Sequence, residues 1–243
     1  CDDIARELPH EEAELILLSR SLQDCGRDMI LSLSPGPALI EKAELYKQTS
    51  NMWRITDDFW DSWPQLYEMF DHAREWCIHA GNGCWPDADM LPIGPIKQDY
   101  DPALRTEFTQ DEQITMMSLW SIFRSPLIIG GEMTGFDDFT MGLITNEEIL
   151  KMHRNARHSH PVWQRDIDGT EHILWTAVSS EGGQYAVIFN TGEQDSSIRI
   201  PLQDLEIYHP VHSTELWSGQ TSEIAETINV SLKKHGAAVF YLN

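Results

Sequence analysis

Residues 51–63 read Asn-Met-Trp-Arg-Ile-Thr-Asp-Asp-Phe-Trp-Asp-Ser-Trp, a short apolar strand that runs into carboxylates and then into the start of a helix. The apolar residues favour a buried strand, while Ser62 and Pro64 are typical of the first turn of a helix. Charged side chains are almost never fully buried unless they are paired, so Asp57 and Asp58 bring little structural benefit at a strand end. The stretch therefore predicts a strand–helix unit that carries a polar site.

The same alternation of strands and helices continues on both sides of this stretch. Helical periodicity and helix-ending signals predict helices over residues 10–25, 38–48, 62–79, 109–124 and 146–154. Short apolar runs predict further strands over residues 29–34, 87–93 and 126–130. Alternation at this spacing is typical of βαβ units and a parallel sheet. Carboxylates at successive strand ends would then converge on one face, as they do in an α/β barrel.

The periodicity changes after residue 160. Six short apolar runs, separated by turn residues such as Gly182-Gly183, predict strands over residues 173–178, 184–189, 197–200, 207–211, 228–232 and 238–242. Their regular spacing is typical of an antiparallel sandwich. We therefore divide the chain into residues 1–160, an α/β region, and residues 161–243, a β-sandwich.

Composition excludes some partners. The 243 residues carry a formal net charge of −22, which would repel both nucleic acid and an anionic membrane surface, so neither is an expected partner. The sequence contains no apolar run of the roughly 18 residues that a membrane span requires. The four cysteines show no metal-type spacing, and the ten histidines are scattered. We assign no metal and no cofactor.

Three segments together resemble glycoside hydrolase family 27, the α-galactosidases and α-N-acetylgalactosaminidases. They are residues 53–63, residues 83–91 (Gly-Cys-Trp-Pro-Asp-Ala-Asp-Met-Leu) and residues 117–127 (Met-Ser-Leu-Trp-Ser-Ile-Phe-Arg-Ser-Pro-Leu). Their order and spacing also agree with the family, and the resemblance covers nearly the whole chain. It implies an α/β fold in which the C-terminal half of a (β/α)8 barrel is followed by an antiparallel β-sandwich.

The resemblance implies a retaining glycosidase that acts on terminal α-galactosides with two catalytic aspartates. Retention requires one carboxylate to attack the anomeric carbon and one carboxylic acid to protonate the leaving oxygen. Asp58 matches the family's acid/base, four residues after Arg54, which matches a ligand of the sugar hydroxyls. Asp2 matches the nucleophile.

Further residues are expected to contact the sugar. Asp89 and Met90 match residues that line the sugar pocket in the family. Trp53 is a candidate because an indole beside carboxylates suits a sugar, whose apolar ring face stacks while its hydroxyls take hydrogen bonds.

The sequence departs from the family pattern at two positions, and the first of them bears on specificity. Ser34-Pro35 stands where the family has a Ser/Cys-Glu pair, so Pro35 replaces the glutamate that binds a galactose 2-hydroxyl. Ile4 stands where a disulfide cysteine is usual. α-N-acetylgalactosaminidase and β-L-arabinopyranosidase therefore remain alternatives with the same mechanism. A non-catalytic carbohydrate-binding protein, with a decayed barrel, is the alternative from another class.

The matched positions begin in the middle of a barrel. A barrel needs eight strands, so we expect the N-terminal half of the same barrel to be required for folding and function. The expected partner is an oligosaccharide or glycoconjugate substrate, while the oligomeric state stays open. The resemblance implies a secreted, periplasmic or lysosomal location, and a cytoplasmic one also stays open.

Overall fold

The computed structural model describes residues 11–34, 36–97, 100–101 and 103–243. Three strands form a parallel sheet in the order β1 (Ser32–Leu33), β2 (Met52–Arg54) and β3 (Trp85–Asp87). Trp53 pairs with Leu33 on one side and with Pro86 on the other. A parallel bridge between Leu91 and Ile129 follows. The predicted strand at residues 126–130 is therefore reduced to one bridge.

Helices alternate with these strands, as the sequence predicts. They are α1 (Glu11–Asp24), α2 (Ala43–Thr49), α3 (Trp63–Trp76), α4 (Gln110–Phe123), α5 (Asp138–Thr145) and α6 (Glu147–Asn155). Short 3-10 turns η1 (Ile40–Lys42), η2 (Cys77–His79) and η3 (Met133–Gly135) extend or join them. The sequence does not predict α5, which contains Gly142, a residue that disfavours a helix interior.

Helix α4 shows why these boundaries fall where they do. Thr109 and Glu112 form a reciprocal capping box at its start, and Arg124 ends it in the left-handed conformation with a φ of 67°. Between these caps nearly every side chain is buried. A helix that is buried on nearly all sides needs neighbours on nearly all sides, and α4 accordingly contacts α3, α5, α6 and strands of the C-terminal part.

The C-terminal part is a two-sheet β-structure. Six strands pair in the order β4 (Ala156–Ile167), β5 (Thr170–Ser179), β6 (Gln184–Asn190), β11 (Ala237–Leu242), β8 (Val211–Glu215) and β9 (Thr221–Ile224). The strands β7 (Ser196–Pro201) and β10 (Thr227–Leu232) pair antiparallel in a second sheet. The turn η4 (Leu202–Leu205) follows β7.

Three features of this part differ from the sequence prediction. The predicted strand at 207–211 is wrong: the extended pairing begins only at Val211, beyond Pro210, which has no N–H to donate to a ladder. The two edge strands, β4 and β9, are not predicted. Strand β4 contains Pro161 and two register shifts, which disrupt the alternation. The predicted domain boundary at residue 160 falls inside β4.

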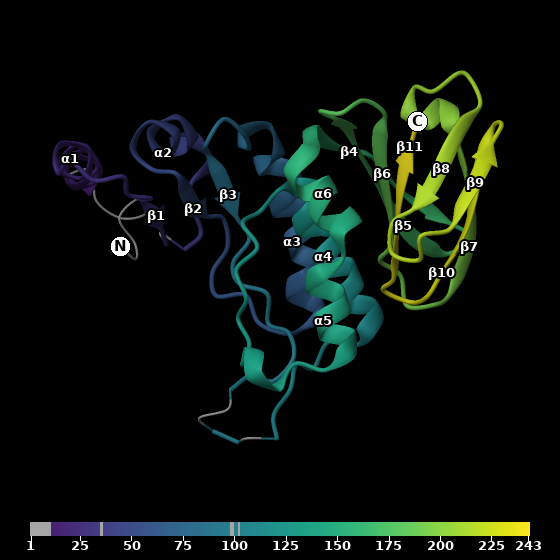
Figure 1. Cartoon of the computed structure of the whole chain (residues 1–243), viewed down its shortest axis with the longest axis horizontal. Helices are drawn as coiled ribbons and strands as arrows, with labels where there is room; N and C mark the ends of the chain where they lie inside the picture. The colour runs from purple at the N-terminus through teal and green to yellow at the C-terminus, as the bar shows by residue number, and fades with distance from the viewer. Residues whose placement is uncertain (1–10, 35, 98–99, 102) are drawn as a thin grey trace.

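The helices α3, α4, α5 and α6 lie between the parallel sheet and the β-sandwich (Figure 1). Helix α4 contacts β5, β6 and β11, so the apolar core continues from one part into the other. The rings of Phe70 on α3 and Phe189 on β6 meet edge to face, with centroids 4.9 Å apart. Buried aromatic contact of this kind joins the two parts into one packed unit.

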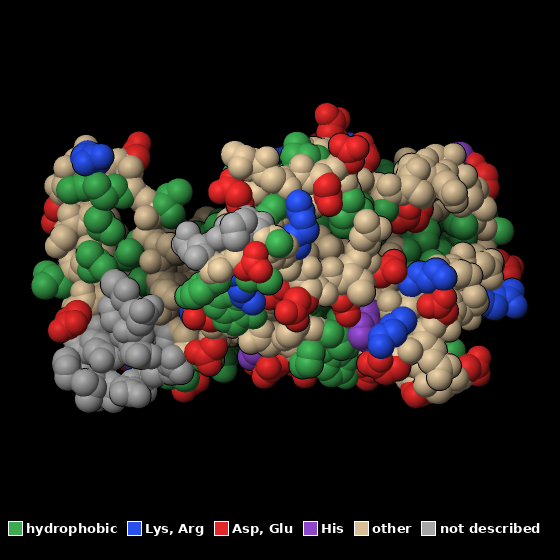
Figure 2. Space-filling model, turned by 90° about the horizontal axis from the view of Figure 1, so that it is seen from below, with side chains coloured by type: hydrophobic (Ala, Val, Ile, Leu, Met, Phe, Trp, Pro, Cys, Tyr) green, Lys and Arg blue, Asp and Glu red, His purple; other side chains and the backbone are tan. Residues whose placement is uncertain are grey.

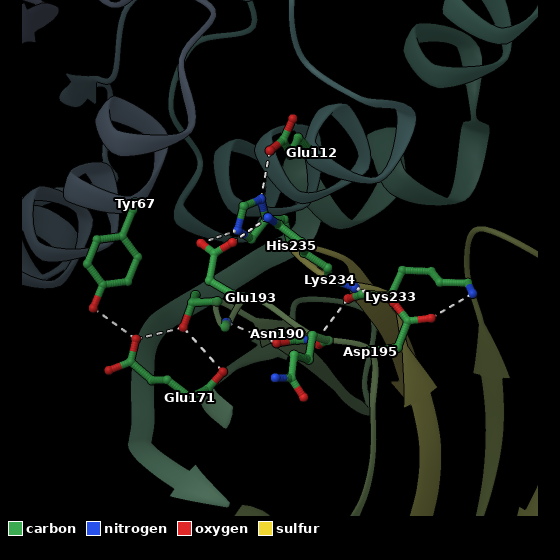
Figure 3. A network of polar contacts seen from close by, with 12 residues as sticks. Tyr67, Glu112, Glu171, Asn190, Glu193, Asp195, Lys233, Lys234 and His235 are labelled. Carbon is green, nitrogen blue, oxygen red and sulfur yellow. Dashed lines mark hydrogen bonds and ion pairs between the residues drawn. The ribbon is translucent and has the colours of Figure 1, made fainter. Parts of the chain in front are cut away.

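Polar contacts reinforce the same junction. Figure 3 shows the His235 ring between two carboxylates, with Nδ1 2.7 Å from Glu112 Oε1 and Nε2 3.2 Å from Glu193 Oε1. Thr115 on α4 donates to the carbonyl oxygen of His235 at 2.6 Å. Nearby, the hydroxyl of Tyr67 donates to Glu171 Oε2 at 2.9 Å. The bonds of Glu112, Thr115 and Tyr67 each join a helix of the first part to a strand or loop of the second. The contact between Glu193 and His235 lies within the second part.

Candidate functional site

Arg54 is the last residue of β2, and its guanidinium joins two carboxylates that follow different strands. Its Nη2 lies 2.8 Å from Asp58 Oδ1, and its Nη1 lies 3.3 Å from Asp89 Oδ2. The Nε donates to the carbonyl oxygen of Thr56 at 3.2 Å. The planar guanidinium carries donors in fixed directions, so these contacts set its orientation.

Asp58 lies in the loop that leaves β2, and 70% of its side chain is exposed. The loop itself is held in place: the side-chain amide of Gln65, on α3, donates to the Asp58 carbonyl oxygen and its Oε1 accepts the N–H of Trp60. An exposed carboxyl on an anchored backbone can reach an incoming ligand.

Asp89 is buried behind this loop, with 7% of its surface exposed. Its Oδ2 accepts the N–H of Phe59 at 2.9 Å, and its Oδ1 accepts the N–H of Met90 at 2.7 Å. The backbone of Asp89 has a φ of 75°, a conformation that residues other than glycine rarely adopt. On the far side, the indole N–H of Trp120 donates to the Asp89 carbonyl oxygen at 3.0 Å.

A third carboxylate, Asp87, adjoins this arrangement. It ends β3 and pairs in register with Arg54 across the parallel sheet. Its Oδ1 accepts the N–H of Asp89 at 3.0 Å. Only 6% of the residue is exposed, and burial raises the pKa of Asp87 to about 6, with the Asp89 charge adding to the rise. Sequence reasoning places Asp87 among strand-end carboxylates but gives it no role.

The structure brings together four of the residues predicted from the sequence. Arg54 contacts both Asp58 and Asp89, and Met90 follows with 48% of its surface exposed. Ser34 is half-buried beyond the end of β1, on the neighbouring strand. Asp2 and Pro35 lie outside the described residues, so their predicted roles as nucleophile and specificity residue stay predictions.

Trp53 does not take part in this group, and its prediction as a sugar contact is wrong. Its side chain is fully buried and stacks on Tyr46 with ring centroids 5.8 Å apart, while the Trp76 ring lies tilted against it at 5.9 Å. Side chains of a strand alternate between faces, so Trp53 points away from the face that Arg54 occupies. The exposed indole near the site is Trp60, with 49% of its surface exposed and Lys97 Nζ 4.9 Å from its ring centroid.

Asp61 has a structural role. It is 5% exposed, accepts the N–H of Glu107 at 2.7 Å and faces Lys97 at 3.5 Å. It therefore anchors the loop before α4 rather than capping α3. No group of three or more His, Cys, Asp or Glu side chains among the described residues is arranged to hold a metal ion.

Acidic side chains are spread over the face seen in Figure 2, with few lysines and arginines among them, in keeping with the net charge of −22. Within the part of the chain that the structure describes, no helix is both long and apolar enough to cross a membrane.

Parallel strands with carboxylates and an arginine at their C-terminal ends, followed by an antiparallel sandwich, define a class: α/β-barrel proteins with a carboxylate site. The family described as Alpha galactosidase A matches residues 5–155, and the Alpha galactosidase C-terminal beta sandwich domain matches residues 169–242. The chain belongs to this family. The predicted fold class, the C-terminal half of a (β/α)8 barrel followed by an antiparallel β-sandwich, is confirmed.

Known proteins resemble the chain over most of its length. A β-L-arabinopyranosidase of family GH27 from Geobacillus stearothermophilus is 40% identical, with a TM-score of 0.90 over 96% of this chain and 54% of its own. A Bacillus halodurans structure, provisionally assigned as an α-N-acetylgalactosaminidase, is 36% identical with a TM-score of 0.82, over 100% of this chain and 57% of its own. Alpha-galactosidase 2 of Arabidopsis thaliana is 23% identical over 93% of this chain and 54% of its own.

The chain thus spans about half the length of these relatives. It spans 28% of a probable alpha-galactosidase D from Aspergillus niger, to which it is 25% identical over 78% of its residues.

Proposed function

We propose that this protein is a retaining glycoside hydrolase that removes terminal α-galactoside-type sugars from an oligosaccharide or glycoconjugate. The observation that carries the proposal is Arg54, which contacts Asp58 at 2.8 Å and Asp89 at 3.3 Å at the C-terminal ends of β2 and β3. These are the ends at which barrel enzymes place their active sites. Membership of the Alpha galactosidase A family supports the reaction class.

The proposed reaction uses two carboxyl groups in two steps. Asp2 attacks the anomeric carbon while the Asp58 carboxylic acid gives its proton to the leaving oxygen, so the glycosidic bond breaks as a glycosyl ester forms. Asp58, now ionised, then takes a proton from water, which displaces Asp2 and releases the sugar with its original anomeric configuration. The two carboxyl groups should stand roughly 5–5.5 Å apart.

Arg54 and Asp89 are the proposed sugar ligands. An arginine fork and a carboxylate present donors and acceptors side by side, which matches two neighbouring hydroxyls of a sugar ring. The exposed side chain of Met90 offers apolar contact at the rim. The chain spans about half of its relatives, so we further propose that the N-terminal half of the same barrel completes the site.

The identity of the sugar has two supported candidates. α-Galactoside cleavage is favoured by the family description and by the names of the plant and fungal relatives. β-L-Arabinopyranoside cleavage is favoured by the 40% identity to an enzyme of that name. Arabinopyranose lacks the hydroxymethyl group of galactose, so both sugars could present the same ring hydroxyls to Arg54 and Asp89.

The deciding assay uses the whole protein and three p-nitrophenyl glycosides: α-D-galactopyranoside, N-acetyl-α-D-galactosaminide and β-L-arabinopyranoside. We expect one of them to be hydrolysed with retention, seen by proton NMR of the first-formed sugar. Asp58→Asn should lower kcat by about 10²- to 10⁴-fold, the usual contribution of general acid catalysis.

The adjacent variant Asp57→Asn is the matched control and should keep activity within a few-fold of wild type. Hydrolysis of none of the three glycosides, inversion, or an Asp58→Asn variant as active as wild type would refute the proposal.

A further inference from the structure

We infer that Asp87 is a positioning residue of the sugar site, which through Asp89 sets where Arg54 and Asp58 stand. Asp87 contacts neither of the proposed sugar ligands through its side chain except at the backbone of Asp89. The inference rests on the proposed function and adds to it a residue beneath the substrate.

The first step is the hydrogen bond between Asp87 and the backbone of Asp89. Its Oδ1 accepts the Asp89 N–H at 3.0 Å, and Asp89 stands at a φ of 75°. Such a backbone persists only where the surroundings enforce it. Trp120 holds the Asp89 carbonyl oxygen at 3.0 Å, and Ser125 Oγ accepts the preceding N–H, of Ala88, at 2.9 Å. Asp87 is thus one of three contacts that impose the conformation.

The second step leads from Asp89 to the reacting group. Asp89 Oδ2 accepts the N–H of Phe59 at 2.9 Å, and this N–H belongs to the peptide that links Asp58 to Phe59. The same oxygen lies 3.3 Å from Arg54 Nη1, while Arg54 Nη2 holds the Asp58 carboxyl at 2.8 Å. A rotation of the Asp89 backbone would therefore displace Asp58 twice, through its peptide and through its partner arginine.

The third step is electrostatic. The charged groups that face Asp87 are Asp89 on its own strand end and Arg54 on β2, and burial raises the pKa of Asp87 to about 6. A hydrogen bond to an ionised carboxylate is stronger than one to a neutral carboxyl group. Loss of the Asp87 charge, as the pH falls through about 6, should therefore loosen Asp89 and weaken sugar binding.

A purely structural Asp87 would behave differently. If it only completed the end of β3, its replacement would change stability and leave the affinity for sugar and its pH dependence as they are. A positioning role predicts changes in both. The distinguishing measurement is therefore equilibrium binding of the free sugar, made on folded protein at several pH values.

The experiment uses the whole protein and calorimetric titration with the free sugar of the hydrolysed glycoside (galactose, N-acetylgalactosamine or arabinose) between about pH 4.5 and pH 8. Asp87→Asn keeps the size of the side chain and an acceptor oxygen but carries no charge. We expect it to weaken binding at pH 7.5 by about five- to tenfold, the difference between a charge-assisted and a neutral hydrogen bond. Its affinity should also change less than that of wild type between pH 5 and pH 7.

Asp61→Asn is the matched control, because Asp61 is equally buried and accepts a backbone N–H from the loop before α4 instead. It should retain wild-type affinity and pH dependence. Asp87→Ser, which shortens the side chain, provides a second variant and should weaken binding at least as much as Asp87→Asn.

The outcomes separate the two proposals. An active wild type whose affinity and pH dependence are unchanged in both Asp87 variants overturns the positioning role and leaves the proposed function intact. A wild type that hydrolyses none of the three glycosides overturns the proposed function, and an absence of sugar binding would then overturn the positioning role with it.

Discussion

The rings of Trp63 and His235 stack face to face, with centroids 3.5 Å apart and planes inclined by 8°. Trp63 begins α3, immediately after the loop that carries Asp58, whereas His235 precedes β11 in the sandwich. The stack and the two carboxylates around the His235 ring lie at the same junction. The sandwich therefore supports the helix that anchors the loop carrying Asp58.

Replacement of His235 tests this support. His235→Ala removes the stack on Trp63 and the partner of the buried Glu112 Oε1, so we expect the free energy of unfolding to fall by about 2–4 kcal/mol. Urea denaturation at fixed pH measures the change. His212→Ala, in an exposed pair with Glu223 on the same sheet system, is the control and should change stability by less than about 0.5 kcal/mol. Equal losses in both variants would refute the special role of His235.

Arg54→Lys should separate charge from geometry at the site. A lysine keeps the positive charge but cannot bridge Asp58 and Asp89 with fixed donors, so we expect kcat/KM to fall by about 10- to 100-fold, in keeping with the 1–3 kcal/mol of a lost charged hydrogen bond. Steady-state kinetics measure the loss. Arg74→Lys, at a surface pair with Asp71, should leave kcat/KM unchanged. An Arg54→Lys enzyme as active as wild type would show that the bridge is dispensable.

Two tryptophans seven residues apart should respond in opposite ways. Trp53→Phe alters a buried stack, so we expect it to lower stability by about 1–3 kcal/mol and to leave KM unchanged. Trp60→Ala removes an exposed indole two residues from Asp58, so we expect it to raise KM for an aromatic glycoside by about two- to tenfold with little change in stability. Thermal denaturation and kinetics on the same preparations test the pair. A reversed pattern would place the sugar contact at Trp53.

The contrast between these tryptophans shows how much of the fold and of the site can be predicted from the sequence. Regular strand–helix alternation predicts α1 to α4 and the parallel sheet, because hydrophobic periodicity survives in elements of that length. The neighbourhood of Arg54, Asp58 and Asp89 follows from motif resemblance. The burial of each side chain does not follow from this resemblance, because it depends on which face of a three-residue strand meets the core. The sequence therefore misassigns Trp53 and leaves Trp60 without a role.

The burial and contacts of the aspartates cannot be predicted from the sequence either. Asp58, Asp61 and Asp87 all stand near strand ends, yet their surroundings differ. Asp58 is exposed, Asp61 anchors a distant loop, and Asp87 is buried next to Asp89. These surroundings depend on contacts with residues up to 46 positions away in the sequence. Local composition cannot specify such contacts, since each depends on the packing of the whole barrel half.

Asp87 should also make stability depend on pH in a defined direction. Burial raises its pKa from 3.8 to about 6, so between these values the folded protein keeps a proton that the unfolded chain releases. The contribution of Asp87 to folding therefore becomes less favourable as the pH rises from about 4 to about 6, and it stays constant above that range. Two pKa units correspond to about 3 kcal/mol.

Asp87→Asn removes this titration. The difference in unfolding free energy between the variant and wild type should therefore grow in favour of the variant across pH 4 to 6, by up to about 3 kcal/mol. Urea denaturation at half-unit pH steps gives the difference curve, and Asp71→Asn, which removes an exposed carboxylate, is the control. A difference curve that is flat for Asp87→Asn, or equally steep for Asp71→Asn, would contradict the assignment of the raised pKa to Asp87. A rising curve, together with weakened sugar binding, would show that a buried charge is retained at this position at the expense of stability, as expected of a residue kept for function.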